Sequence, residues 1–361
     1  MKLLIVIPTL GNGGAERVAS ILGNAFSKKH DVRIVLLEDS SINPYVLNDS
    51  IQIKKLDFKV KHGHKLSSIF LYFANFSKIR SALIKEIEEY NPSTIISFLP
   101  KVDFLISTIK LKGIRWIASE RNDPKSRSFI VRKALISIFK KSSILVVQTN
   151  KVLNFYKKNK IPNVLIIKNP ISRIIHQSTV ANIINVPFIL SVGRLDKQKN
   201  LGTLIKVYYH LKKRDGIEHK LIIIGEGPLR KKLTSLVSRL GIKDYVFLPG
   251  RIDDVASYYS KASLFVLPSK YEGMPNALLE AMSFGIPVVS TDFYTGAAKE
   301  LICDGNGFLV PVDDKKALEN AISRGLALND DERRNMARRS FLVLEDYSVE
   351  KVIQEWEKIL V

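Results

Sequence analysis

Short apolar runs that alternate with helical patterns are the feature that most restricts the fold of this chain. The first run, residues 3–7, precedes a glycine-rich loop and a stretch with apolar residues at helical spacing. Further runs occupy residues 33–37, 94–98, 115–118, 144–148 and 164–167. Because strands that alternate with helices form parallel βα units, residues 1–170 are predicted to form a doubly wound α/β domain.

A second series of the same kind begins at residue 188. Its strand-like runs occupy residues 188–193, 221–224, 245–248, 264–267 and 287–290, again with helical patterns between them. We therefore predict a second Rossmann-like domain over residues 188–345. The intervening residues 171–187 lack a strong apolar period, which predicts an interdomain linker with a cleft beside it.

The composition is that of a globular protein that does not cross a membrane. With 46% hydrophobic and 25% charged residues over 361 positions, the chain is long enough for two domains. Lysines and arginines interrupt the longest apolar tracts, so none approaches the roughly 20 apolar residues of a membrane-spanning helix. The one cysteine, Cys303, cannot form an internal disulfide, and no N-terminal leader pattern is recognisable. These features favour a reducing, cytoplasmic compartment.

Positive charge is concentrated in the first half of the chain. Residues 1–180 contain 30 Lys and Arg against 12 Asp and Glu, whereas residues 181–361 contain 26 against 23. Within residues 110–173, Glu120 and Asp123 are the two acids that oppose 16 basic side chains. Such a field predicts attraction to an anionic surface or substrate. The alternatives are a general bias toward lysine and the binding of nucleic acid.

Two stretches of the first half combine apolar residues at helical spacing with lysines and arginines. They are residues 65–89 and residues 129–139, and the second is flanked by Arg132, Lys133, Lys140 and Lys141. Each is predicted to be an amphipathic helix. It either lies in the interface of an anionic membrane or covers its own sheet.

Loops at the ends of two predicted strands carry groups that can bind phosphate. Gly11, Gly13 and Gly14 lie between the first strand and its helix, where backbone N–H groups can approach an anion. Such a loop can equally serve only to turn the chain. After the strand that begins at residue 188, Arg194 and Lys199 supply the positive charge that a diphosphate leaving group requires. Taken alone, these two cations could also belong to a solvated loop.

The most specific pattern is a pair of carboxylates, Glu272 and Glu280, with seven residues between them. Glu272 lies in a glycine loop after a predicted strand, and Glu280 lies about two turns into the helix that follows. Backbone N–H groups of residues 273–278 can bind a phosphate, while the two carboxylates accept hydrogen bonds from hydroxyls on either side. A nucleotide sugar has this order of groups, with a hexose, a diphosphate and a ribose. The pattern therefore predicts a nucleotide-sugar site.

Taken together, these motifs resemble glycosyltransferase family 4, the retaining transferases of GT-B fold. The resemblance extends over residues 13–17, 192–195 with Lys199, 225–228, 248–250, 272–280 and 285–289. It implies an α/β fold with two Rossmann-like domains that face each other across a cleft. It also implies that residues 346–361 form a helix that crosses back to the first domain.

The resemblance assigns roles to individual residues. Arg194 and Lys199 would bind the donor diphosphate, Glu272 would contact the transferred sugar, and Glu280 would hold the ribose. The remaining donor contacts are implied for main-chain groups of Gly13, Gly14, Arg251, Ile252, Gly273, Met274, Asn276, Ala277 and Leu278, with residues 251 and 252 beside the base. Such enzymes are metal-independent and use no cofactor besides the donor. The sequence has no Asp-x-Asp in its first half and no spaced His/Cys cluster.

The group that assists the acceptor hydroxyl is not assigned by the resemblance. In a retaining reaction the hydroxyl would attack the face from which the diphosphate leaves, and a phosphate oxygen would take its proton. Many relatives have a histidine near this place in the first domain, whereas this chain has residues 96–100 and 118–124 there, without a histidine. Glu120 at a strand end is our candidate for acceptor-side chemistry, unless it merely pairs with Arg121.

Two further segments indicate the class of acceptor. Residues 119–122 and 292–297 resemble the subgroup that extends bacterial lipid-linked oligosaccharides, O-antigens and capsules. This implies transfer from a UDP-sugar, either UDP-N-acetylhexosamine or UDP-hexose, to a glycan on a polyprenyl diphosphate or another glycolipid. The enzyme would act peripherally at the inner face of the plasma membrane. A soluble transferase with a small acceptor is the nearest alternative, and a nucleic-acid-binding protein would leave Glu272 and Glu280 unexplained.

Overall fold

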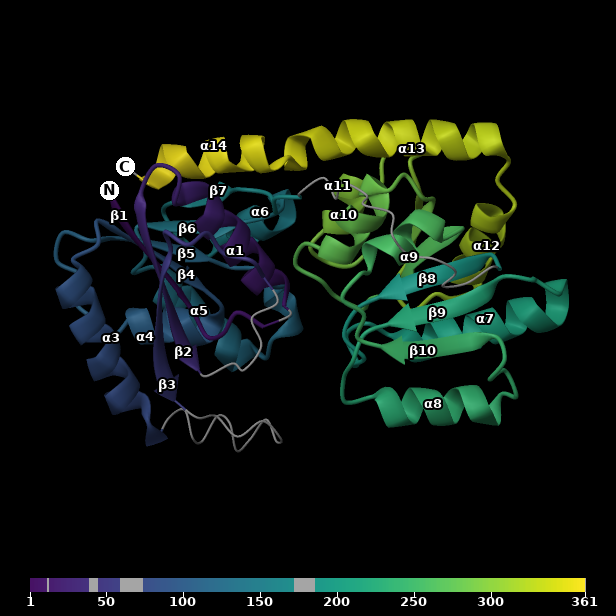
Figure 1. Cartoon of the computed structure of the whole chain (residues 1–361), viewed down its shortest axis with the longest axis horizontal. Coiled ribbons are helices and arrows are strands. Elements are labelled where there is room, and N and C mark those ends of the chain that lie inside the picture. Colours follow the sequence, from purple (N-terminus) through teal and green to yellow (C-terminus); the bar gives the residue numbers. More distant parts are fainter. Residues whose placement is uncertain (12, 39–44, 59–73, 172–185, 361) are drawn as a thin grey trace. The chain divides into compact units, whose positions relative to one another are not determined.

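The computed structural model describes residues 1–11, 13–38, 45–58, 74–171 and 186–360. The chain forms two compact units, the first made of Met1–Pro170 and Val349–Val361 and the second of Ile171–Ser348. Each unit holds one parallel sheet covered by helices, as Figure 1 shows, so the predicted α/β class with two Rossmann-like units is confirmed. The predicted linker, residues 171–187, lies almost entirely outside the described residues.

The sheet of the first unit has seven parallel strands in the order β3-β2-β1-β4-β5-β6-β7. The strands are β1 (Lys2–Ile7), β2 (Asp31–Glu38), β3 (Gln52–Phe58), β4 (Thr94–Phe98), β5 (Arg115–Ser119), β6 (Ile144–Val147) and β7 (Val164–Ile166). Because side chains alternate along a strand, β1 contributes to two cores. Leu3, Ile5 and Ile7 pack on one face of the sheet, and Leu4 and Val6 pack on the other.

The helices of the first unit divide between these two faces. They are α1 (Gly14–Phe26), α3 (Phe76–Tyr90), α4 (Pro100–Ile106), α5 (Phe129–Phe139), α6 (Asn150–Lys158) and α14 (Val349–Leu360). Helices α1 and α14 cover the face with Leu3, while α3, α4, α5 and α6 cover the face with Leu4. Both faces of the sheet are therefore buried, as the near-continuous apolar strands require.

The C-terminal helix α14 belongs to the first unit, as the resemblance implied. Its buried face includes Val352, Trp356 and Leu360. The hydroxyl of Thr94 in β4 donates to the carbonyl of Leu360 at 3.0 Å. Lys29, just beyond α1, pairs with Glu357 at 2.8 Å. The helix is thus fixed to the first unit by apolar burial and by polar contacts at its end.

The sheet of the second unit has six parallel strands in the order β10-β9-β8-β11-β12-β13. The strands are β8 (Phe188–Val192), β9 (Lys220–Ile224), β10 (Val246–Gly250), β11 (Leu264–Leu267), β12 (Val288–Thr291) and β13 (Phe308–Val310). The helices are α7 (Leu201–Asp215), α8 (Arg230–Arg239), α9 (Ala256–Lys261), α10 (Asn276–Ser283), α11 (Ala297–Leu301), α12 (Lys315–Leu326) and α13 (Asp330–Leu344). Helices α7, α8 and α12 pack on one face, and α9, α10 and α11 pack on the other.

Two strands were absent from the sequence prediction, and both lie at a sheet edge. β3 carries exposed residues at positions 52–55, so its sequence shows polar residues where a buried strand shows a continuous apolar run. β13 has three residues, too few to give a periodic signal. The predicted helix over residues 65–89 lies partly outside the described residues, and α3 covers its second part. Among the described residues no helix has the length and apolar character needed to span a bilayer.

Candidate active site

The carboxyl ends of β8 and β11 bring Lys199 and Glu272 together in the second unit. The ammonium of Lys199 lies 2.6 Å from Oε1 of Glu272, and the two side chains are 16% and 8% exposed. The sequence places these residues 73 positions apart, and the adjacency of β8 and β11 in the sheet accounts for their meeting. In open α/β sheets this edge is where ligands bind.

Two neutral donors complete the environment of the Glu272 carboxylate. The amide of Gln198 donates to Oε2 at 2.9 Å, and the hydroxyl of Ser269 donates to Oε1 at 2.7 Å. The main chain at Glu272 is also held, because Thr295 Oγ1 donates to its carbonyl at 3.0 Å. Sequence reasoning missed Gln198 and Ser269, since neutral polar residues in a loop carry no periodic or charge signal.

Glycines allow the loops after β8 and β9 to approach each other closely. Gly225 has φ +140°, and a Cβ there would lie 2.0 Å from the carbonyl oxygen of Gly193. A Cβ on Gly193 would lie 2.8 Å from Cε of Lys199. A side chain at either glycine would therefore displace the main chain or the lysine that forms the site.

Arg194, the other predicted diphosphate ligand, pairs with Asp196. Its side chain is 67% exposed, and its Nε donates to Oδ2 of Asp196 at 2.7 Å. The second oxygen of Asp196 accepts the backbone N–H of Lys199 at 3.2 Å. Asp196, which sequence reasoning did not single out, thus fixes the loop that presents both cations.

Helix α10 begins at Asn276, directly after the glycine loop, and offers its N-terminus next to Glu272. Pro275 is the N-cap residue and makes no side-chain cap hydrogen bond. The first N–H groups of any helix lack an acceptor within the helix, so this end can receive an anion. Met274 is 7% exposed and Leu278 is fully buried, and the backbone N–H of Leu278 donates to the carbonyl of Pro275 at 3.0 Å.

Glu280 lies closer to the start of α10 than the sequence suggested. It is the fifth residue of the helix, just over one turn in, whereas about two turns were predicted. Its Oε2 accepts a hydrogen bond from the hydroxyl of Tyr259 in α9 at 3.0 Å. The predicted base-binding residues Arg251 and Ile252 follow β10, where the guanidinium of Arg251 lies 3.5 Å from Asp253.

The glycine loop of the first unit has a carboxylate beside it. Gly13 is the N-cap of α1, and Gly14 is the first residue of that helix. A Cβ on Gly13 would lie 1.9 Å from Oε2 of Glu16, which is in the first turn. The hydroxyl of Tyr45 donates to the carbonyl of Gly13 at 3.2 Å. Space around this N-terminus is therefore shared with an acidic side chain.

Glu120 pairs with Arg127, where the sequence had suggested Arg121. Both Glu120 oxygens accept from the Arg127 guanidinium, with Nη2 at 2.9 Å from Oε1. The hydroxyl of Tyr156 donates to Oε2 at 3.1 Å, and the backbone N–H of Asn122 donates to Oε1 at 2.9 Å. Burial and the Glu120 carboxylate raise the pKa of Tyr156 well above its ordinary value. With four donors on two oxygens, this carboxylate is fully engaged inside the first unit.

Arg121 is buried among aromatic rings in the first unit. Its guanidinium donates to Oδ1 of Asn169 at 2.6 Å and lies 5.5 Å from the Phe98 ring and 5.9 Å from the Trp356 ring. Within the described part of the chain its Nε and Nη2 have no hydrogen-bond partner. Burial lowers the pKa of Arg121 to about 9. This residue ties the end of β7 to helix α14.

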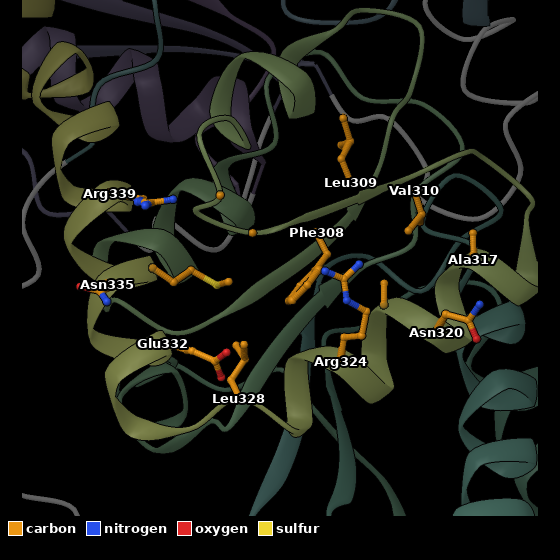
Figure 2. Close-up of a pocket in the computed structure, with 14 residues that line it drawn as sticks. Phe308, Leu309, Val310, Ala317, Asn320, Arg324, Leu328, Glu332, Asn335 and Arg339 are labelled. Carbon is orange, nitrogen blue, oxygen red and sulfur yellow. The ribbon is translucent and has the colours of Figure 1, made fainter.

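A hollow of about 660 Å³ lies beside β13. Figure 2 shows the residues that line it, and none of the predicted site residues is among them. Strand β13 and helices α12 and α13 line it. Its arginines are already engaged, because Arg324 stacks 5.0 Å from the Phe308 ring and Arg339 donates to the carbonyl of Asp304 at 2.5 Å. In the described ranges, no group of three or more His, Cys, Asp or Glu side chains is placed to hold a metal ion.

Comparison with known proteins identifies the class. The model of the family Glycosyl transferases group 1 matches residues 178–341, which lie within the second unit. A Campylobacter jejuni α-1,4-N-acetyl-D-galactosaminyltransferase, named for an undecaprenol-linked glycan, is 31% identical over 371 residues, with 100% of this chain and 98% of the relative covered. This chain belongs to the group 1 glycosyl transferases and is a glycosyltransferase.

Two further similarities place the chain within this class. A second Campylobacter jejuni enzyme, a diphospho-undecaprenol 4-α-N-acetylgalactosaminyltransferase, is 30% identical, with 92% of each chain covered. The crystal structure of Anabaena HepE in complex with UDP and glucose has a TM-score of 0.82 at 17% identity, over 100% of this chain and 99% of that one. At this identity the likeness shows the fold, which is the GT-B fold.

Proposed function

We propose that this glycosyltransferase moves a sugar from a UDP-sugar to a glycan on a polyprenyl diphosphate or another glycolipid, with retention of configuration. UDP-N-acetylhexosamine and UDP-hexose are the donors that we would test first. The observation that carries the proposal is the Lys199–Glu272 contact at the ligand-binding edge of the second sheet. The names of the two Campylobacter relatives support the acceptor class, and the UDP complex of HepE supports the donor nucleotide.

The donor diphosphate is negatively charged, and positively charged groups of the site hold it. Lys199, Arg194 and the N-terminus of α10 stabilise the negative charge that grows on the diphosphate as its bond to the sugar breaks. Glu272 accepts a hydrogen bond from the sugar, and Glu280 accepts one from the ribose. Because these groups supply the positive potential themselves, the reaction proceeds without a metal ion.

The acceptor hydroxyl attacks the face from which the diphosphate leaves, and a phosphate oxygen takes its proton. No protein nucleophile is required in this reaction. Glu120 supports the acceptor side by holding residues 121–128 through its ion pair with Arg127. Its four hydrogen bonds favour this positioning role over that of a general base.

The start of helix α5 gives the first unit a surface suited to an anionic membrane. Phe129, Ile130 and Val131 are 58%, 80% and 46% exposed, whereas Leu135 and Ile138 are buried in the unit's own core. The predicted apolar stripe along the helix is therefore divided, with an exposed tip and an inward-facing remainder. Lys133 lies 4.6 Å from the Phe129 ring, so cations flank the exposed tip.

Vesicle flotation tests this docking at the inner face of the plasma membrane. The wild type and a variant with Arg132, Lys133, Lys140 and Lys141 changed to glutamate are floated with anionic vesicles at low and high salt. We expect flotation of the wild type at low salt alone, because charges near a membrane are screened within a Debye length. If the variant floats equally well, or the wild type fails to float at low salt, a soluble enzyme with a small acceptor is favoured.

Donor and acceptor are tested by incubating the enzyme with a panel of UDP-sugars and other nucleotide sugars. Each donor is offered with a polyprenyl-diphosphate glycan or with the same glycan lacking the lipid. We expect transfer from a UDP-sugar to the lipid-linked glycan with an α-linked product. Transfer from another nucleotide sugar alone, or a β-linked product from an α-linked donor, would refute the proposal.

A further inference from the structure

The Glu272 carboxylate is held by one charged donor and two neutral donors that come from separate segments. Lys199 and Gln198 follow β8, whereas Ser269 follows β11. The residue Glu272 is 7% exposed. A buried carboxylate that loses its cation must keep other hydrogen bonds or take up a proton.

The proposed function makes competing demands on Lys199. Its ammonium is required at the donor diphosphate, yet it lies 2.6 Å from Glu272. The lysine side chain runs past Gly193, where the absence of a Cβ leaves it room beside the backbone. The Lys199 ammonium is thus carried by a flexible chain of methylene groups that no side chain at position 193 obstructs. It can therefore change partners.

The neutral donors lie on segments that are fixed independently of the lysine. The carbonyl of Gln198 accepts the backbone N–H of Lys270 at 2.8 Å. The carbonyl of Ser269 accepts from Thr291 Oγ1 at 2.5 Å, and Ser269 itself is fully buried. Movement of the Lys199 ammonium therefore leaves these two hydrogen bonds to Glu272 in place.

We propose that donor binding moves Lys199 from Glu272 to the diphosphate, and that Gln198 and Ser269 are positioning residues that keep the Glu272 carboxylate oriented during this exchange. The inference rests on the proposed function, since it takes a nucleoside diphosphate as the competing anion. Gln198 holds one oxygen and Ser269 holds the other. Each carboxylate oxygen can accept more than one hydrogen bond, so Glu272 can still accept one from the sugar.

The exchange predicts an effect on UDP binding that a fixed lysine would not give. UDP carries the diphosphate but no sugar, so it competes with Glu272 for Lys199 without contacting Glu272. Glu272→Gln removes the competing charge and keeps the size of the side chain. We expect this variant to bind UDP about threefold more tightly than the wild type, while its transfer rate falls. Unchanged or weaker UDP binding by folded Glu272→Gln would overturn the exchange.

Gln198→Ala and Ser269→Ala test the positioning role. We expect kcat to fall about tenfold in each, since a hydrogen bond to a buried charge is lost. UDP affinity should stay within about twofold of the wild type, because the phosphate ligands are intact. Ser269→Thr retains the hydroxyl and should restore most of kcat. Gln52→Ala, in edge strand β3 of the first unit, is the matched control for loss of a glutamine and should behave as the wild type.

The outcomes separate this inference from the proposed function. If the wild type fails to bind UDP, the proposed donor is wrong. If the wild type binds UDP and transfers sugar, but Gln198→Ala and Ser269→Ala turn over at the wild-type rate, the positioning role is wrong. Parallel losses of UDP affinity and kcat in these variants would place the two residues at the phosphates and would also refute it.

Discussion

The two units each place a glutamate at the carboxyl end of a central strand, but the two carboxylates are held in opposite ways. Glu272 in the second unit shares its oxygens among a lysine and two neutral donors next to a helix N-terminus. Glu120 in the first unit is engaged by both arms of Arg127, by Tyr156 and by a backbone N–H.

The difference shows that position on the sheet does not decide the role of a carboxylate. A lysine on a flexible stem can leave one carboxylate for a ligand. A bidentate arginine and a buried tyrosine fix the other in one geometry. Glu272 can therefore change partners, whereas Glu120 has a structural role and holds residues 121–128 through its ion pair with Arg127.

The largest effect should come from breaking the Glu120–Arg127 ion pair, and it should be an effect on stability. Arg127→Ala leaves Glu120 buried without its cation, and we expect the free energy of unfolding to fall by about 3–5 kcal/mol. Urea unfolding measures this change. Lys85→Ala, which removes an exposed pair with Glu89, is the control and should change stability by less than about 0.5 kcal/mol. If both substitutions change stability by equal, small amounts, the Glu120–Arg127 ion pair does not stabilise the fold.

Removal of the Lys199–Glu272 pair should affect turnover more than stability. We expect Lys199→Ala and Glu272→Ala each to lower kcat/KM by at least about tenfold, which is about 1.4 kcal/mol of transition-state stabilisation. Both groups lie where charge develops as the donor bond breaks. Steady-state kinetics of sugar transfer, with circular dichroism to confirm folding, provide the measurement. A folded variant with wild-type kinetics would exclude its residue from the site.

A third carboxyl, Asp103 in helix α4, should make the stability of the first unit depend on pH. Burial raises its pKa well above the ordinary value of 3.8, although the hydroxyl of Ser97 donates to Oδ1 at 2.6 Å. The folded chain thus keeps a proton that the unfolded chain releases. The free energy of unfolding therefore falls as pH rises from about 4 toward the folded pKa.

Asp103→Asn is uncharged at every pH and should lose this dependence. Urea unfolding at pH 5 and pH 8 should show the variant gaining stability relative to the wild type at the higher pH. Glu120 and Arg127 face Asp103 and are unchanged in the variant, so they do not mask the difference. Parallel pH profiles of the two proteins would contradict a buried neutral Asp103.

The smallest expected effect is that of metal removal. Since Lys199, Arg194 and the N-terminus of α10 supply the positive charge around the donor, activity should survive an excess of EDTA. Initial rates of transfer with and without EDTA provide the comparison. Loss of activity on chelation, with recovery on adding Mn²⁺ or Mg²⁺, would show that the side chains of the second unit do not suffice.

Much of the fold was predictable because buried parallel strands have near-continuous apolar sequences. The predicted runs at residues 94–98 and 264–267 coincide with β4 and β11. The edge strands β3 and β13 were missed, since one is largely exposed and the other is very short. The other two edge strands, β7 and β10, still carry apolar runs and were predicted, so it is exposure and shortness that hide a strand from the sequence.

The site was predictable where charge and glycine mark the ends of strands. Lys199 and Glu272 each follow a predicted strand, and the resemblance assigned both to the donor site. Their direct contact was not predicted, because it depends on β8 and β11 being neighbours in the sheet. The contacts of Gln198 and Ser269 depend on loop geometry, which has no repeat in the sequence. For a related reason, the sequence suggested Arg121 as the partner of Glu120. The turn between β5 and α5 brings Arg127 back to the carboxylate, and sequence distance favoured Arg121.

Titration calorimetry with UDP tests the account most directly, because it measures whether Lys199, the partner of Glu272, binds the donor nucleotide. UDP is titrated into the wild type, Lys199→Ala and Lys212→Ala, the last removing a lysine that lies 4.4 Å from the Tyr245 ring elsewhere in the second unit. We predict that the wild type and Lys212→Ala bind UDP alike, and that Lys199→Ala binds at least about tenfold more weakly. Equal binding of UDP by all three proteins, or no binding by the wild type, would contradict the account.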